Sequence, residues 1–320
     1  MKVSICITIK DEEKWIGALL DSLALQSKKA DEIVIVDGGS TDKTVEIIKH
    51  YQKKNRNIKL LVEEGGIAHG RNTAIEIAKY PIIVQIDAGC IAEKDWLEKL
   101  VRPFELSQEP EAGVGVSAGF YIMPSSSFLQ KAMNLYLGIH PKRFDPANFL
   151  PSARSVAFKK EVWEKVGGYD ESLEKGGEDT KFFISCVKTG IRIARVGDAK
   201  VIWEETAGYG IKNFFLKIFN YAKGDAKTKL WIYPIPGIMS HNIKILFVFI
   251  RYLLGLGLLI ISFTNPPFFY FVLGLFVLYI FWSVWKFRDI CKSWQVRVWI
   301  PIVQIVSDIA VMLGFLYGIL

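Results

Sequence analysis

Three short apolar runs in the N-terminal half of the chain each end in a polar cluster. The runs are Val3–Ile9, Ile33–Val36 and Pro81–Ile86, and the clusters are Lys10–Glu12, Asp37–Ser40 and Asp87–Gly89. A carboxylate such as Asp87 can face a metal ion or a sugar, and the small residues after it leave room for a ligand near the backbone. An Asp also commonly ends a strand in a turn, so the stretch around Asp87 alone supports either interpretation.

The elements that would position these clusters alternate between strand and helix. Runs rich in β-branched residues predict buried strands, and segments with apolar residues at helical spacing follow them. We expect strands at 3–9, 33–36, 58–62 and 81–86, and helices at 15–25 (with Asp11 as its N-cap), 44–51 and 69–79. This order predicts right-handed βαβ units and a parallel sheet, at whose carboxyl edge ligands collect. Acids at the same end of several strands favour a functional role for Asp87.

A further acidic cluster, Glu178-Asp179, lies at a predicted helix start. It follows a Gly-rich loop over 169–178 and opens a helix that runs to about Thr189. Acids are common in a first helical turn, where exposed N–H groups stabilise the anion, so a plain charged helix start is the alternative. The remaining expected elements are helices at 92–104, 124–136 and 160–166, the last ended by Gly167-Gly168, and strands at 115–122, 154–158, 191–196 and 200–203; residues 140–151 read as a loop.

Composition bounds the class of protein. The 320 residues carry a net charge of +7, and 51% of them are hydrophobic. Mean hydropathy is +0.24, and apolar residues crowd the last quarter, so the basic excess is better explained by a membrane than by nucleic acid, which we do not expect as a partner. The four scattered cysteines form no CxxC pair, which argues against a zinc site and indicates a reducing compartment. No signal peptide is evident, so we expect the N-terminal part in the cytoplasm.

The last third of the chain has the pattern of a membrane anchor. Ile211–Lys223 sets aromatic and aliphatic residues against lysines, which favours a helix in the membrane interface over an ordinary packed helix. Three apolar stretches, 245–263, 268–285 and 299–320, are near the length needed to cross a bilayer. The expected division is therefore a domain over 1–208, an interfacial helix and linker over 209–242 and a small α-helical transmembrane domain over 243–320.

Charge predicts the orientation of this anchor. The loop Lys286–Arg297 is basic, and the positive-inside rule places it in the cytoplasm together with the N-terminal domain. The expected location is the cell membrane, with several crossings. Arg251 and Asp308 fall within spans; Arg251 either snorkels to the interface or contacts a lipid phosphate, and Asp308 is expected to pair with a neighbouring helix.

Five motifs, in this order, resemble those of the family 2 glycosyltransferases. They are VSICITIKDEE, DEIVIVDGGSTDKT, GIAHGRNTAIEIA, IDAGC and VGGYDESLEKGGEDTKF, and together they cover roughly residues 1–203. Each motif alone is weak, and the ordered set carries the resemblance. The resemblance implies a GT-A, Rossmann-like nucleotide-sugar-binding domain and an inverting transfer of a sugar, here in a membrane-anchored subfamily.

The resemblance also implies roles for individual residues. Asp37, with Gly38, would contact the nucleoside, and Thr8, Lys10 and Glu12 would line the same pocket. Arg71 would approach the diphosphate or hold the loop of Asp87, Ala88 and Gly89, and Asp87 would bind a divalent metal or the donor sugar. Asp179 would be the general base with Glu178 beside it, and Trp203, Tyr221 and Asp225 would shape the acceptor entrance. The alternatives are a plain turn at Asp37 and a surface ion pair at Arg71.

The metal motif departs from the family's commonest pattern. Its third residue is Gly89 rather than Asp, and Trp203 stands where many members have a His. A divalent cation, Mn²⁺ or Mg²⁺, remains the expected cofactor, because Mg²⁺ is often held by one or two carboxylates together with phosphates. A similar Asp-Ala-Gly and Trp occur in some membrane-bound members, so the departure reads as a subfamily trait.

The expected function is transfer of a sugar from a UDP- or GDP-sugar to a membrane-associated, lipid-linked acceptor. A catalytically silent scaffold that binds nucleotide sugars is the first alternative, motivated by Gly89 and opposed by the intact Glu178-Asp179. A sugar nucleotidyltransferase is the second, but it would need a Gly-rich basic loop after the first strand, and Lys10–Glu13 is not one.

Overall fold

The protein is described by a computed structural model that covers residues 1–106, 113–173 and 176–320. It forms two compact units. The first unit comprises residues 1–124, 144–207 and 234–236, and the second comprises residues 125–143, 208–233 and 237–320. Residues 174–175 of the loop predicted over 169–178 lie outside the described residues. The predicted division at residues 208 and 242 stays a prediction.

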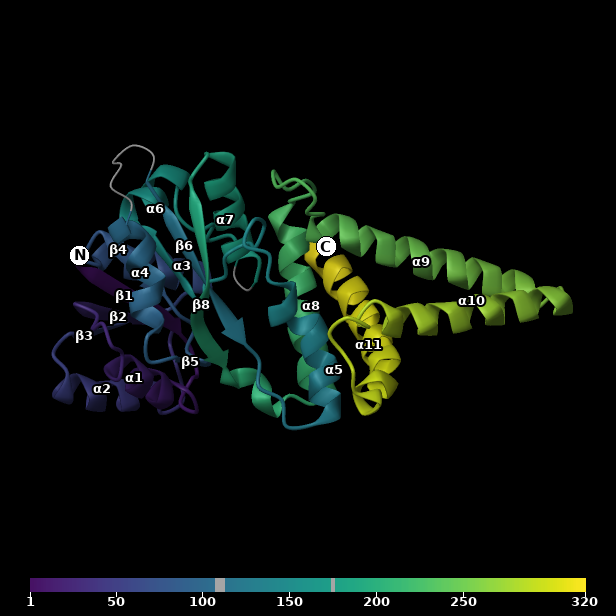
Figure 1. Cartoon of the computed structure of the whole chain (residues 1–320), viewed down its shortest axis with the longest axis horizontal. Coiled ribbons are helices and arrows are strands. Elements are labelled where there is room, and N and C mark those ends of the chain that lie inside the picture. Colours follow the sequence, from purple (N-terminus) through teal and green to yellow (C-terminus); the bar gives the residue numbers. More distant parts are fainter. Residues whose placement is uncertain (107–112, 174–175) are drawn as a thin grey trace. The chain divides into compact units, whose positions relative to one another are not determined.

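The first unit is built around an eight-stranded mixed sheet with the order β3-β2-β1-β4-β7-β6-β8-β5 (Figure 1). Strands β1 to β4 are parallel to their neighbours among themselves, as predicted. Beyond β4 the sheet is mixed: β7 pairs antiparallel with both β4 and β6, β5 pairs antiparallel with β8, and β6 and β8 are parallel. The strands are β1 (Val3–Ile9), β2 (Glu32–Asp37), β3 (Ile58–Val62), β4 (Ile82–Gln85), β5 (Cys90–Ala92), β6 (Val116–Ile122), β7 (Val156–Lys159) and β8 (Ile193–Trp203).

Six helices of the first unit connect these strands. They are α1 (Ile16–Ala24), α2 (Thr44–Lys54), α3 (Ile67–Ile77), α4 (Trp96–Leu106), α6 (Lys160–Val166) and α7 (Glu178–Lys188). Helix α6 ends as predicted, at Gly167 with a φ of 83°. Asp11 does not cap α1, because the helix begins only at Ile16 and the Asp11 carboxylate instead accepts the Thr41 N–H at 2.8 Å.

Strand register brings the polar clusters to one edge of the sheet. Ile9 of β1 lies opposite Asp37 of β2, and Cys6 of β1 lies opposite Gln85 of β4. Because these strands are parallel, the segments that follow them leave the sheet on the same side. The expectation that the ends of the three strands share one edge is confirmed.

The second unit is helical apart from its connecting segments. Helix α11 packs along α8 and α5, and α9 pairs with α10 (Figure 1). Within the described part of the chain, three helices, α9, α10 and α11, are long and apolar enough to cross a membrane. The bounds of these helices are α5 (Phe128–Leu137), α8 (Ile211–Thr228), α9 (His241–Ser262), α10 (Pro266–Trp285) and α11 (Trp294–Ile319). A short 3₁₀ helix follows α5 at Pro141–Arg143. Another lies at Glu204–Gly208, where the first unit ends at Ala207.

Candidate functional site

A buried arginine joins three elements at the carboxyl edge of the sheet. Arg71, in the second turn of α3, donates from Nη1 to Glu178 Oε1 at 2.5 Å and from Nη2 to Asp87 Oδ1 at 3.2 Å. Glu178 opens α7, and Asp87 follows β4. The structure therefore brings together predicted site residues that lie 16 and 107 positions from Arg71 in the sequence.

Burial and charge reinforce one another in this cluster. The Arg71 side chain is 5% exposed, and burial alone would lower its pKa, but the carboxylates of Glu178 and Asp87 offset this and raise the pKa. Burial also raises the pKa of Glu178, while the Arg71 guanidinium opposes that shift. Two buried charges that depend on each other in this way fix the position of Arg71 rather than offer Glu178 to a substrate.

The accessible carboxylates of the cluster are Asp87 and Asp179. The Asp87 side chain is 36% exposed although it pairs with Arg71. Asp179 is partly exposed in the first turn of α7, where its Oδ1 accepts the Thr180 N–H at 2.7 Å. Hydrogen bonds from a helix start stabilise a carboxylate as the anion. Asp179 is therefore better placed than Glu178 to accept a proton from a substrate.

The end of β1 lies directly against the helix that carries Arg71. A Cβ on Gly70 would lie 2.4 Å from Thr8 Cγ2, so α3 and β1 approach more closely than any residue but glycine permits. The Thr8 hydroxyl is buried and has no hydrogen-bond partner among the described residues. Lys10 is exposed just beyond the strand, and the Glu12 N–H donates to Thr44 Oγ1 at 2.7 Å.

The Asp37 carboxylate forms hydrogen bonds within the turn that follows β2. Its Oδ2 accepts the N–H groups of Gly39 at 3.1 Å and Ser40 at 2.9 Å, and its Oδ1 accepts the Ser40 hydroxyl. The residue is fully buried. The Gly38 N–H donates to the Ile9 carbonyl at 2.8 Å and so joins the ends of β1 and β2. The structure thus gives Asp37 the turn role, and its contact with a nucleoside stays a prediction.

The surroundings of Gly89 leave no room for a side chain, because Glu205 lies against it. A Cβ on Gly89 would lie 2.7 Å from the Cβ of Glu205, whose own N–H donates to the Gly89 carbonyl at 3.1 Å. Ala88, just before it, is buried. Glu205 was not predicted as a neighbour of this loop. It lies there because Cys90 in β5 pairs with Trp203 in β8, and no local sequence pattern indicates that pairing.

The side chains at this site could hold a metal ion only if a bound substrate supplied further ligands. Across the described ranges, no group of three or more His, Cys, Asp or Glu side chains is placed to hold a metal. Asp87 offers one exposed carboxylate, and residue 89 has none. Oxygen ligands from a diphosphate would have to complete the coordination, which is the usual way in which proteins hold Mg²⁺.

The three predicted acceptor residues differ in their surroundings. Trp203 is 1% exposed, donates from Nε1 to Glu205 Oε2 at 3.0 Å and lies under the Arg154 guanidinium at 3.8 Å. Tyr221 and Asp225 lie on α8 of the second unit, where Asp225 Oδ1 is 3.1 Å from His241 Nδ1. Their role at an acceptor entrance stays a prediction.

Asn72 and His69 are structural contributors that the sequence did not single out. Asn72 Oδ1 accepts the Tyr169 N–H at 2.8 Å and the Trp163 indole N–H at 3.0 Å, and its Nδ2 donates to the Tyr169 carbonyl at 2.9 Å. His69 lies between Glu63 at 2.8 Å and Glu171 at 3.0 Å. Both residues tie the segment before α7 to α3. Their position beside Arg71 in the sequence was the one available signal.

Comparisons with known proteins agree with this architecture. The model of Glycosyl transferase family 2 matches residues 4–158. The poly(ribitol-phosphate) beta-glucosyltransferase of Bacillus spizizenii is 36% identical over 121 residues, which are 36% of this chain and 18% of that protein. The glucosyl-dolichyl phosphate glucuronosyltransferase of Haloferax volcanii is 23% identical over 195 residues, 56% of this chain and 59% of that protein. The chain thus spans less than two thirds of either relative.

A solved structure extends the likeness in fold over nearly the whole chain. The mannosyltransferase PcManGT from Pyrobaculum calidifontis, in complex with GDP-Man and Mn²⁺, superposes with a TM-score of 0.64 at 18% identity, covering 97% of this chain and 86% of that one. At this identity the likeness concerns the fold. Together with the matched family model, it confirms the resemblance drawn from the five motifs. Residues 4–158 therefore match glycosyl transferase family 2, and the chain has the GT-A fold.

Proposed function

We propose that the protein is a membrane-anchored, inverting glycosyltransferase that moves a sugar from a UDP- or GDP-sugar to a lipid-linked acceptor. The observation that carries this proposal is the cluster held by Arg71, which leaves the carboxylates of Asp87 and Asp179 accessible at the carboxyl edge of the sheet. Ligands collect at that edge in open α/β sheets.

Asp179 is the proposed general base. Inversion is a single displacement, so one carboxylate must remove the proton from the acceptor hydroxyl while the nucleotide diphosphate leaves. Glu178 and Arg71 position the start of α7 and the Asp87 loop, since they contact one another in a buried ion pair. Asp87 would hold a divalent cation together with the donor diphosphate, and that cation would supply neutralisation of the leaving group's charge.

The lipid-linked acceptor and the cellular location are proposed from the second unit. Its apolar helices support attachment to a membrane, with the catalytic unit in the cytoplasm. The name of the Haloferax relative, which contains a dolichyl phosphate, supports an acceptor of lipid type. The GDP-Man and Mn²⁺ bound to PcManGT support a nucleotide sugar and a divalent cation here.

The test is nucleotide release by the full chain in detergent with Mn²⁺ or Mg²⁺. A panel of UDP- and GDP-sugars is offered with a membrane lipid extract, and wild type is compared with Asp179→Asn and with Glu46→Gln, an exposed acid on α2. We expect lipid-dependent release of UDP or GDP that Asp179→Asn abolishes and Glu46→Gln leaves unchanged. The anomeric configuration of the product, read by NMR, should be opposite to that of the donor.

Two outcomes would contradict the proposal. Binding of a donor without any turnover would favour the catalytically silent scaffold. The absence of a carboxylate at Gly89 is the observation that suggests this alternative. Retention of the donor's anomeric configuration would exclude a single displacement and with it the proposed role of Asp179.

A further inference from the structure

Helix α11 is packed differently from the other two apolar helices. Of its most apolar 18-residue stretch, 39% is buried within the protein, against 11% in α9 and 6% in α10. Its buried residues recur at steps of three and four and so form one continuous stripe. One side of α11 is thus committed to protein contacts along its length, through Val296, Ile300, Val303, Ser307, Ala310 and Gly314.

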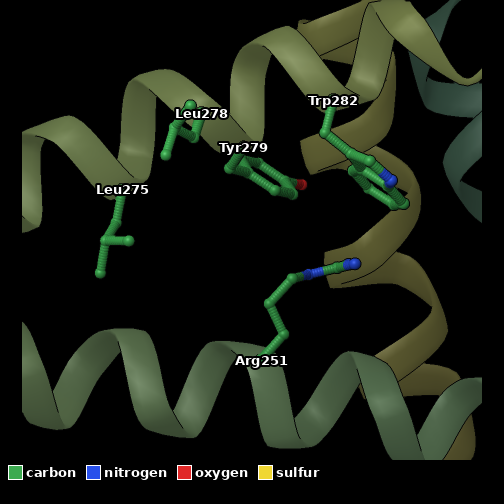
Figure 2. A pocket seen from close by; sticks show the side chains of 5 residues that line it. All are labelled: Arg251, Leu275, Leu278, Tyr279 and Trp282. Carbon is green, nitrogen blue, oxygen red and sulfur yellow. The ribbon is translucent and has the colours of Figure 1, made fainter.

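Helices α9 and α10 form an antiparallel hairpin. They are joined by the short turn over 263–265, and Arg251 of α9 faces Tyr279 and Trp282 of α10 across a cavity of about 410 Å³ (Figure 2). The Arg251 guanidinium lies 5.1 Å from the Tyr279 ring and 5.4 Å from the Trp282 ring. The chain enters this hairpin at His241 and leaves it at Trp285, so these two residues mark its base.

Contacts along α11 reach from the base of that hairpin to the middle of α9, where Arg251 lies. Gln304 accepts a hydrogen bond from the Lys286 amino group, which lies one residue beyond α10. Asp308 accepts from Arg251 Nη2 at 2.6 Å, and Phe315 belongs to a buried cluster with Ile245 in the second turn of α9.

The direction of these contacts does not fit a third crossing. From residue 304 to residue 315, over about 16 Å of helix, the partners change from the end of α10 to the beginning of α9. A span that started at the base would instead lead toward the 263–265 turn at the hairpin's far end. Helix α11 therefore runs across the base of the hairpin.

The contact between α11 and α8 is a second argument against a third membrane crossing. A Cβ on Gly314 would lie 2.2 Å from the Phe219 carbonyl oxygen, and one on Gly318 would lie 2.5 Å from the Lys223 carbonyl oxygen, so the backbones of α11 and α8 touch. The last part of α11 should therefore lie at the same depth in a membrane as α8. Charged side chains are costly in the hydrocarbon core, and α8 carries five, which are Lys212, Lys217, Lys223, Asp225 and Lys227.

We propose that α11 lies with α8 in the plane of the membrane surface, and that only the α9–α10 hairpin crosses the bilayer. The partner of this surface is the boundary between headgroups and acyl chains. The face of α11 opposite its buried stripe is exposed and apolar, as that boundary requires; it carries Val298, Ile302, Ile309, Leu313 and Leu316. Two crossings replace the three predicted from the sequence, and Leu320 lies on the same side as the first unit.

Single cysteines in the full chain test the number of crossings. The native cysteines are buried, so a membrane-impermeant maleimide reports on the introduced ones. The variants are Lys54→Cys on α2, Thr264→Cys in the hairpin turn and Leu320→Cys, all at exposed positions. We expect Lys54→Cys and Leu320→Cys to be labelled from one side of sealed vesicles and Thr264→Cys from the other. Labelling of Leu320→Cys from the side of Thr264→Cys would overturn the proposal, as would labelling of all three from one side.

Depth measurements test the in-plane orientation independently. Spin labels at Val298→Cys, Ile309→Cys and Leu316→Cys, all on the exposed face, are compared by their collisions with oxygen and with a water-soluble nickel complex in phospholipid vesicles. We expect the three labels at the same shallow depth. A label at position 309 near the bilayer centre, about 15 Å below the surface, with the other two shallower would show a spanning helix and overturn the proposal. Neither readout depends on catalytic activity.

Discussion

Glu178 and Asp179 are adjacent acids with different surroundings. The Glu178 side chain is 5% exposed and bound to Arg71, whereas Asp179 is partly exposed and accepts a hydrogen bond from the backbone of its own helix. Removing one partner of a buried ion pair leaves an uncompensated charge, whereas an accessible carboxylate has water as an alternative partner. Stability should therefore depend on Glu178 and proton transfer on Asp179.

Two substitutions separate these roles. We expect Glu178→Ala to lower the free energy of unfolding by about 3–5 kcal/mol, because Arg71 stays buried beside only the partly exposed Asp87. Asp179→Asn should change stability by less than about 0.5 kcal/mol and reduce turnover by about 10²–10⁴-fold. Chemical denaturation followed by tryptophan fluorescence and the nucleotide-release assay measure the two effects. Equal losses of stability in the two variants would contradict the division of roles.

His69 should make stability depend on pH. Its hydrogen bonds with Glu63 and then Glu171 raise the pKa of its imidazole. The folded protein therefore holds this proton more tightly than the unfolded chain, so the contribution is complete below the unfolded pKa of about 6.5 and is lost as pH rises through the folded pKa. We expect His69→Gln to lower Tm more at pH 5.5 than at pH 9.

The exposed His50 of α2 provides the matched substitution, His50→Gln. Its effect on Tm should be small at both pH values. A loss of Tm in His69→Gln that is the same at pH 5.5 and pH 9 would show that the two carboxylates do not hold the imidazolium.

The sequence indicated which residues come together at the candidate site better than it indicated how they contact one another. The pattern of strand ends, and the resemblance, named Arg71, Asp87 and Glu178 before any contact was known, and the structure joins them. Sequence could not show that Glu178 is the buried partner and Asp179 the accessible one. Glu205 escaped notice because its position beside Gly89 depends on a pairing of strands that lie more than 100 residues apart.

At the scale of elements, the close approach of α3 to β1 places Arg71. Alanine at an exposed helical position is ordinarily better than glycine by about 1 kcal/mol, but a Cβ at residue 70 would meet the Thr8 methyl at 2.4 Å. Gly70→Ala should therefore destabilise the protein, since overpacking costs about 1–3 kcal/mol. Thr8→Ser removes that methyl, so the double variant should be more stable than the sum of the two single effects by about 0.5–3 kcal/mol.

Gly17 of α1 is the control for this prediction. A Cβ there would meet only the Tyr51 hydroxyl, at an ordinary 3.7 Å. Gly17→Ala should leave the protein unchanged or more stable by up to about 1 kcal/mol. Additive effects of Gly70→Ala and Thr8→Ser in chemical denaturation would show that the two elements have room to separate.

Elements with strong local patterns were predicted well, and those defined by a distant partner were not. The continuous β-branched runs gave β1 and β3 with correct ends. Strand β5 was missed because its three residues form a strand only by pairing with β8. Residues 191–196 and 200–203 were predicted as two strands, but β8 is one strand whose register with β6 shifts, with Ala118 opposite Arg195 and Phe120 opposite Lys200.

At the scale of the molecule, the two units interleave along the chain. The segment over 125–143, which contains α5, lies within the first 208 residues but belongs to the second unit. Its helix packs against α8 and α11, which come much later in the sequence. The predicted boundary at residue 208 would therefore separate α5 from the helices that cover it.

This interleaving predicts how shortened chains behave. A chain ending at Gly208 keeps α5 but loses α8 and α11, so the apolar side chains that α5 buries, such as Met133 and Leu137, become exposed. Contiguous exposed apolar surface of this kind promotes aggregation. We expect that chain to elute as aggregates in size-exclusion chromatography, and a matched chain with residues 125–143 replaced by a Gly/Ser linker of equal length to elute as a monomer. Monomeric behaviour of the chain that retains α5 would show that this helix does not need α8 and α11 to remain soluble, and would contradict this prediction.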